Sequence, residues 1–349
     1  MKLFKCQYCS QLLYFENRHC GNCSHKLGYL AKENELSALE QNDTAWKAMA
    51  SPDMPYRFCA NSEFDVCNWL IDAKGAENYC IACRHNRMVP DVQQRSNVAA
   101  WYKLEAAKHR LFYTLLRLDL PLENRTDIGD QGLAFDFLSD GDDTHTPKVM
   151  TGHDDGLITI ALAEADDVER ERRRTAMREP YRTLLGHFRH EVGHYYWDRL
   201  VRDGGKLEAC RKIFGDDRAN YEQALQKHYI DGAPPDWQER FVSSYATTHP
   251  WEDFAETWAH YLHIVDTLEM ARAFNLRTSP KLDEDIASNA DFDPYAVKDV
   301  QQLTNTWIPL TFALNSLNRT MGRDDLYPFV ISPPVIEKLG FIHGLVHRF

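Results

Sequence analysis

The sequence predicts an α+β protein in which a small cysteine-bearing region precedes a larger domain with a small mixed sheet and a mainly helical C-terminal part. Three observations lead to this class. Eight of the nine cysteines lie within the first 83 of 349 residues. After them the residue patterns run in the order helix, several strands, long helix, which favours a sheet beside helices. The last third has helical patterns that are interrupted by prolines.

Composition excludes several functional classes. With 44% hydrophobic and 26% charged residues, the chain can bury one large core or two smaller ones. No run of 18 apolar residues exists to span a membrane, and the opening residues lack the apolar stretch of a secretory signal. We therefore expect a cytoplasmic protein with no membrane association. Its net charge of −12 argues against non-specific nucleic-acid binding.

Two cysteine pairs open the chain. The first four cysteines form two CxxC pairs: Cys6, Cys9, Cys20 and Cys23. Zinc prefers four soft ligands in a tetrahedron, and each CxxC turn supplies two of them. Disulfides are the alternative, but thiols in a cytosolic protein stay reduced. The spacing therefore predicts a first structural zinc in a ribbon hairpin.

A second set of cysteines has a less regular spacing. It consists of Cys59, Cys67, Cys80 and Cys83, with seven residues between the first two. We predict a second four-thiolate zinc site, with a reduced buried pair or a redox site as alternatives. Four thiolates leave no open coordination position, so both zincs would be structural. Metal binding would then supply much of the folding energy of residues 1–96.

The ribbon region has no strong signal for a partner. Residues 1–30 have a charge of only +3 with histidines neutral, which is too small for a nucleic-acid patch. A protein partner or a purely structural role is the better expectation. We place the end of this region at residue 96, so that residues 97–349 form the second domain.

The second domain begins with a helix and continues with strands. Trp101, Leu104, Leu111, Leu115 and Leu118 follow three- and four-residue spacings, which predict an amphipathic helix over 97–118. Ser96 is the expected N-cap.

Strands follow this helix. Alternation at Leu133, Phe135 and Phe137 predicts a strand, and 139–143 is a polar loop. A hairpin is expected from 149–151 and 157–162, joined by a loop over 152–156.

The most informative pentapeptide is His190-Glu191-Val192-Gly193-His194. Two histidines at i and i+4 share one side of a helix, so both imidazoles can reach one metal. Glu191 lies on a neighbouring edge of the same helix, where it can act as a base without binding the metal. Pro180 suits the start of this helix. A chance occurrence of the motif is the alternative explanation.

A third ligand is expected from a later helix, because catalytic zinc takes three protein ligands and leaves one position open. Glu252 and Glu256 share a helix face at i and i+4. One can ligate while the other orients a ligand imidazole. We favour Glu252 as the ligand, and Glu256 itself and His249 are the alternatives.

These motifs resemble those of the gluzincin metallopeptidases, in particular the lethal-factor-like branch. The resemblance implies a zincin-like fold in which His190, His194 and Glu252 bind the catalytic zinc and Glu191 is the general base. It also implies that Glu256 is the partner of a ligand. The branch has a tyrosine seven residues before the ligating glutamate, and here that residue is Tyr245, which would stabilise the oxyanion. The sequence departs from the branch at Asp253, where an apolar residue is usual.

The whole chain is similar to bacterial zinc-binding metallopeptidases that carry an N-terminal double zinc-ribbon region. Three stretches carry this similarity: 67–70, 186–191 and 250–256. The similarity implies a peptidase and names no substrate.

We therefore expect a zinc metallopeptidase that hydrolyses peptide or amide bonds in a peptide or protein substrate. It would hold one catalytic and two structural zinc ions. The hairpin within 148–162 is the expected edge strand for peptide pairing. Two other functions remain open: a catalytically inactive, zincin-shaped binding or scaffold protein, and a hydrolase of a non-peptide amide conjugate.

Overall fold

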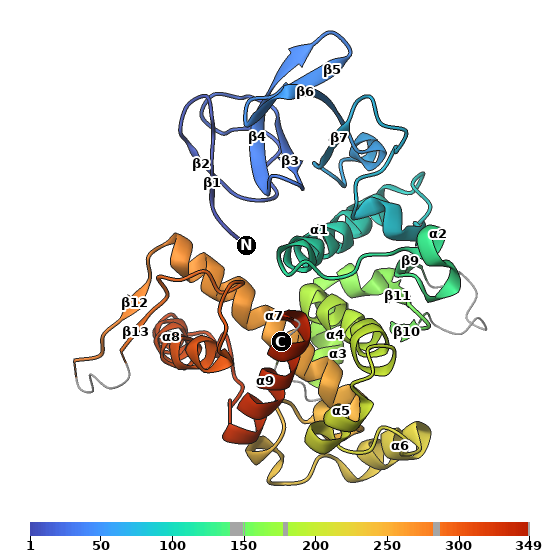
Figure 1. Cartoon of the computed structure of the whole chain (residues 1–349), viewed down its shortest axis with the longest axis vertical. Helices are drawn as coiled ribbons and strands as arrows, with labels where there is room; N and C mark the ends of the chain where they lie inside the picture. The colour runs from blue at the N-terminus through green and yellow to red at the C-terminus, as the bar shows by residue number, and fades with distance from the viewer. Residues whose placement is uncertain (140–148, 150, 177–180, 282–286, 348–349) are drawn as a thin grey trace. The chain divides into compact units, whose positions relative to one another are not determined.

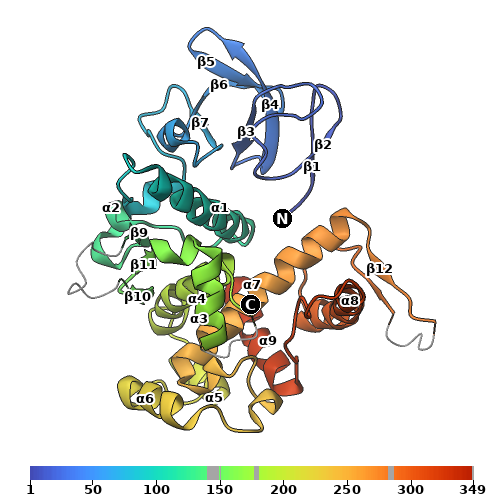
Figure 2. The same cartoon turned by 180° about the vertical axis from the view of Figure 1, so that it is seen from behind.

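The computed structural model describes residues 1–139, 149, 151–176, 181–281 and 287–347. These residues form two compact units, Met1–Arg170 and Glu171–Phe349. Figures 1 and 2 show the chain from opposite sides. Strands predominate in the first unit and helices in the second, so the predicted α+β class with a helical C-terminal part is confirmed.

The N-terminal part of the first unit contains two antiparallel sheets. A short hairpin pairs β1 (Phe4–Lys5) with β2 (Leu12–Leu13). The larger sheet has the order β3 (Leu27–Leu30), β4 (Glu35–Asn42), β5 (Ala45–Ala48), β6 (Ser51–Phe58) and β7 (Leu70–Asp72). The sequence analysis did not predict this five-stranded sheet.

The larger sheet curls so that its first and last strands approach each other. The Tyr29 N–H donates to the Asn68 carbonyl at 2.9 Å. A Cβ at Gly28 would lie 2.6 Å from the Leu70 side chain, so this approach requires glycine. Leu30, Leu39, Ala48, Tyr56 and Leu70 form a buried cluster, which gives this region a small core of its own.

The first unit continues with a long helix and a four-stranded mixed sheet. The helix is α1 (Arg95–Arg117), and a single turn, α2 (Arg125–Ile128), follows it. The sheet order is β10 (Gly152–Asp154), β11 (Leu157–Ala161), β9 (Ala134–Leu138) and β8 (Asn86–Met88). β9 is parallel to both of its neighbours, and β10 is an antiparallel edge strand. The predicted helix, the strand at 133–137 and the mixed sheet are therefore confirmed.

Two local predictions in this unit are wrong. Gln94 occupies the N-cap of α1, so Ser96 lies inside the helix. The hairpin loop is also shorter than expected, because β10 begins at Gly152. Asp155 and Gly156 make the turn with φ angles of 43° and 80°, and two left-handed residues suffice to reverse the chain. Of the predicted polar loop at 139–143, only Ser139 lies within the described residues. Met150, which belongs to the predicted hairpin, also lies outside them.

The second unit is mainly helical. Its helices are α4 (Leu184–Tyr196), α5 (Leu207–Phe214), α6 (Tyr221–Asp231), α7 (Pro250–Ala273), α8 (Val300–Thr320) and α9 (Pro333–His347). α3 (Asp167–Ala176) runs across the boundary of the two units, and β12 (Arg277–Thr278) pairs with β13 (Ser288–Asn289). α4 starts at Leu184 behind an N-cap at Thr183, and the predicted starter Pro180 lies outside the described residues.

α7 is the central helix of the second unit and packs against α4, α8 and α9 (Figure 1). Phe254, Trp258, Leu262, Val265 and Leu268 are fully buried along it. Burial of such side chains is worth about 1.5–3 kcal/mol each. α7 therefore provides the hydrophobic core on which the rest of this unit is assembled.

Two buried ion pairs also fix α7. Arg189 on α4 pairs with Asp266, which also accepts a hydrogen bond from the Tyr295 hydroxyl at 2.5 Å. Lys338 on α9 pairs with Asp253 at 2.6 Å, where Asp253 is 1% exposed. Burial raises the pKa of Asp253 to about 7 although Lys338 opposes the shift. The unusual acidic residue at 253 thus has a partner on a neighbouring helix.

α4 and α7 are in close contact at Gly193. A Cβ at this position would lie 3.0 Å from the Ala255 Cα and 3.3 Å from the Trp258 Cβ. One turn away, the rings of Tyr196 and Trp258 stack with centroids 4.9 Å apart. Glycine inside the HEVGH motif therefore sets how near the two helices can lie.

Among the helices that the structure describes, none combines the length and the apolar sequence needed to cross a bilayer.

Replacing Gly193 with valine should lower the free energy of unfolding by about 1–3 kcal/mol, because the added side chain forces α4 away from α7. Urea denaturation measures this change. Gly344→Ala is the matched control: Gly344 also lies in a helix, but its Cβ would meet nothing within 4 Å. That variant should gain roughly 0.5–1 kcal/mol from helix propensity. Unchanged stability in Gly193→Val would show that the helix contact tolerates a side chain.

Candidate metal centres

The helix α4 holds both histidines of the HEVGH motif on one side. The Thr183 hydroxyl begins the helix by accepting from the Gly186 N–H at 3.0 Å. α7 begins with Pro250, a residue suited to a first helical turn. Glu252 lies in that first turn, so the α4–α7 contact determines where its carboxylate lies.

Three side-chain atoms from these helices converge. The Nε2 atoms of His190 and His194 are 3.2 Å apart. Glu252 Oε2 lies 3.0 Å from the first and 3.5 Å from the second. His194 and Glu252 are 3% and 2% exposed. Two imidazoles and one carboxylate are the donor set of many catalytic zinc sites.

The electrostatics of this triad favour a cation. Burial raises the pKa of Glu252, but His194 and His190 hold it well below its usual range. Burial likewise lowers the pKa of His190, but Glu252 and Glu256 raise it well above its ordinary value. The buried Glu252 carboxylate is thus held in its charged form by positive charge at the two imidazoles. A divalent cation would supply that charge, so the residues present fit zinc.

Glu256 lies behind His190. Its Oε1 accepts from His190 Nδ1 at 2.6 Å, and its Oε2 accepts from the Ser243 hydroxyl at 2.6 Å. With the proton on Nδ1, the lone pair of His190 Nε2 points toward His194 and Glu252. Glu256 therefore has the orienting position that the resemblance implies.

His249 takes no part in the triad. Its Nδ1 accepts from the Trp251 N–H at 3.1 Å, which caps α7. Its Nε2 lies 3.1 Å from the Ala219 carbonyl. Of the three candidate third ligands, the structure brings only Glu252 to both histidines.

Glu191 and Tyr245 both lie near His190. Glu191 is partly exposed and follows His190 directly on α4. Tyr245 opens the 3₁₀ helix Tyr245–Thr247, and its ring centroid is 5.9 Å from that of His190. Burial raises the pKa of Tyr245, and Glu252 and Tyr221 raise it further. The hydroxyl therefore stays protonated and can donate.

Several supporting residues were missed by the sequence analysis. The Tyr221 hydroxyl donates to Glu252 Oε1 at 2.6 Å. The Trp251 ring covers His194 with centroids 3.7 Å apart. Ser243 holds Glu256 as described above. Trp251 directly precedes Glu252 and could have been noticed, but Tyr221 and Ser243 have no motif of their own.

The first four cysteines converge, as their spacing predicts. Their sulfurs lie within 4.8 Å of one another, with Cys6 and Cys23 at 3.7 Å and Cys9 and Cys20 at 3.5 Å. A backbone hydrogen bond from Gln11 lowers the pKa of Cys9 to about 6. All nine cysteines are free thiols. The four converging sulfurs fit a tetrahedral zinc site.

The second four cysteines also converge within 4.8 Å, and all are buried. The 3₁₀ helix Ala60–Phe64 occupies the long spacing between Cys59 and Cys67, so the chain leaves the cluster and returns. Backbone N–H groups of Trp69 and Cys83 donate to Cys67 and Cys80 sulfurs, each at 3.4 Å. Such donors stabilise thiolates, and the cluster fits zinc.

A histidine from α1 also contacts the sulfurs of this second cluster. His109 Nε2 lies 3.6 Å from both Cys67 Sγ and Cys83 Sγ. Its ring stacks on Trp69 with centroids 5.0 Å apart. His109 therefore ties the first helix after the cysteine region to the cluster. Sequence analysis could not predict this contact, because His109 belongs to no spacing motif.

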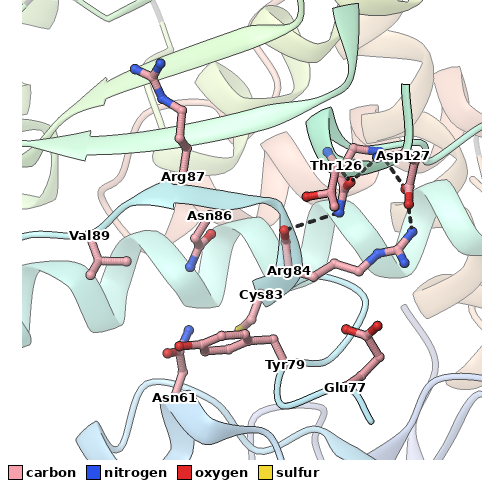
Figure 3. Close-up of a pocket in the computed structure, with 11 residues that line it drawn as sticks. Asn61, Glu77, Tyr79, Cys83, Arg84, Asn86, Arg87, Val89, Thr126 and Asp127 are labelled. Atoms are coloured by element: carbon pink, nitrogen blue, oxygen red, sulfur yellow. Dashed lines mark hydrogen bonds and ion pairs between the residues drawn. The ribbon is translucent and has the colours of Figure 1, made fainter. Parts of the chain in front are cut away.

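A cavity of about 400 Å³ lies beside Cys83 (Figure 3). Its arginines are already paired: Arg84 with Asp127 at 3.1 Å, and Arg87 with the buried Asp136. None of the triad residues lines it. The geometry assigns no chemistry to this cavity.

Comparisons with known proteins place the chain in two described families. The model of the family described as "Putative zinc-binding metallo-peptidase" matches residues 97–345, and that of a "zinc-ribbon domain" matches residues 3–94. Uncharacterized proteins of Mycobacterium bovis and of two strains of Mycobacterium tuberculosis are each 41% identical, over 99% of this chain and 95% of their own. No solved structure matches the chain.

His109→Phe should weaken metal binding at the second cysteine cluster, because phenylalanine keeps the stacking on Trp69 but loses the N–H donor. Loss of such a donor typically costs 10–100-fold in metal affinity. Zinc transfer to a colorimetric chelator measures this. His25→Phe is the control, since His25 stacks on Tyr8 near the first cluster. Release at the wild-type rate from His109→Phe would contradict the assigned role.

Proposed function

This chain belongs to the "Putative zinc-binding metallo-peptidase" family, and from that premise we propose that it is a zinc-dependent peptidase that hydrolyses peptide or amide bonds at His190, His194 and Glu252. One observation carries the proposal. Glu252 Oε2 comes from a separate helix and lies 3.0 and 3.5 Å from the two imidazole nitrogens of HEVGH. This is the ligand arrangement of a gluzincin, and we propose a zincin-like domain over residues 97–349.

Zinc at this site would supply Lewis acidity, lowering the pKa of a water toward about 7 and polarising the substrate carbonyl. Glu191 is the general base: it takes a proton from the attacking water and passes it to the leaving amine. The Tyr245 hydroxyl donates to the oxygen on which negative charge develops. Removing one such donor typically costs about 10²–10³ in rate. Glu256 and Ser243 keep His190 oriented.

We further propose that residues 1–96 form a double zinc ribbon with structural zincs at the two cysteine clusters, giving three zincs per chain. Four thiolates leave no coordination position for a substrate. The region stabilises the fold and is the part that would bind a protein partner. Zinc-held thiolates suit the reducing conditions of the cytoplasm, where we place the protein.

Glu191→Gln should abolish hydrolysis while all three zincs remain, because the amide cannot accept the proton and Glu191 is not a ligand. A loss of at least about 100-fold is expected. Labelling of new peptide termini in a cell extract, with wild type and variant in parallel, measures cleavage. Metal analysis of the same samples measures zinc.

Glu337→Gln, an exposed change on α9, is the matched control and should leave activity intact. Cleavage that survives in Glu191→Gln would contradict the assigned base. A wild-type chain that produces no new termini would favour a binding or scaffold function.

A further inference from the structure

Glu252 divides its two oxygens between different partners. Oε2 faces His190 and His194, and Oε1 accepts the hydroxyl of Tyr221 at 2.6 Å. Tyr221 is the first residue of α6, far from both motif helices in the sequence. A short hydrogen bond to a carboxylate is among the stronger kinds in proteins. Tyr221 thus restricts how Glu252 can rotate.

Tyr221 also lies close enough to Tyr245 for each side chain to shift the pKa of the other. Tyr221 thus binds the proposed metal ligand and neighbours the proposed oxyanion donor.

The helix that carries Tyr221 buries none of its own residues, so hydrophobic packing does little to hold it in place. His228 lies seven residues after Tyr221, on the same face of α6. Its Nδ1 is 3.3 Å from the Thr247 hydroxyl, and its ring centroid is 6.1 Å from that of Tyr245. The face of α6 that carries Tyr221 therefore meets the 3₁₀ helix that carries Tyr245.

We propose that Tyr221 is a positioning residue of the hydrolytic site. Its hydroxyl holds Glu252 so that one carboxylate oxygen faces the histidines. The inference rests on the proposed function and deepens it. No bond to carbon is made or broken by Tyr221, which acts only through Glu252.

Tyr221→Phe tests this inference. The variant keeps the ring contacts with His249 and Trp251, whose centroids lie 5.5 and 5.9 Å away, and loses the hydrogen bond to Glu252. The zinc at the triad should pass to a chelator 10–100-fold more readily than in wild type, because a carboxylate ligand without its partner is less well oriented. The cysteine-bound zincs and the melting temperature should not change.

Kinetics give a second measurement. In Tyr221→Phe, kcat should fall with little change in KM, because poorer orientation of Glu252 at the zinc weakens an interaction made mainly in the transition state. Tyr229→Phe is the matched control: Tyr229 lies on the same helix and is 66% exposed. It should retain wild-type zinc and kcat.

The outcomes separate this inference from the proposed function. Wild-type zinc retention and kcat in Tyr221→Phe would overturn the role of Tyr221 and leave the peptidase proposal intact. Equal zinc loss in Tyr221→Phe and Tyr229→Phe would also overturn it, since the effect would then belong to the helix. A wild-type chain with only two zincs would instead refute the triad itself.

Discussion

The contact between α4 and α7 is the constraint on which the second unit depends. One helix carries both imidazoles and the other carries the carboxylate, so the distance between them determines whether a metal can be held. Gly193 permits the approach, because any Cβ there would press on the Ala255 backbone. The ion pair of Arg189 with Asp266 joins the same two helices further along. Hydrophobic burial along α7 supplies the stability, and the glycine and the ion pair define the geometry.

Burying so many polar groups at one place is costly unless each has a partner. Each of the two carboxylates at the triad has more than one partner. Glu252 is shared between the histidines and Tyr221, and Glu256 between His190 and Ser243. The same principle applies to the second cysteine cluster, where backbone N–H groups and His109 surround the sulfurs. In both places one partner comes from a segment distant in the sequence: Tyr221 for Glu252, and His109 for the sulfurs.

Sequence reasoning was reliable where the signal is local. The spacing of HEVGH, the CxxC pairs and the apolar period of α1 each reflect a single helix or turn, and the structure shows these elements where they were expected. Glu252 was favoured over Glu256 and His249 on helix geometry, and the structure brings Glu252 alone to both histidines. Ser96 failed as a cap because α1 starts one residue before it, and local propensity does not fix a helix start that closely.

The residues that were missed act through tertiary contact. Tyr221, Ser243 and His109 lie far in sequence from the groups they touch, and nothing in their neighbourhoods marks them. The five-stranded sheet was missed because β3, β5 and β7 have only four, four and three residues. In addition, β4 ends in the polar run Glu40, Gln41 and Asn42, which has no strand alternation. Such features follow from packing between segments, which a single sequence does not display.

Anomalous X-ray scattering from crystals of the zinc-loaded protein, recorded on both sides of the zinc absorption edge, tests the central claim most directly. The account predicts a peak about 2.0–2.2 Å from His190 Nε2, His194 Nε2 and Glu252 Oε2. A protein with zinc in its cysteine clusters but no peak among these three atoms would contradict it.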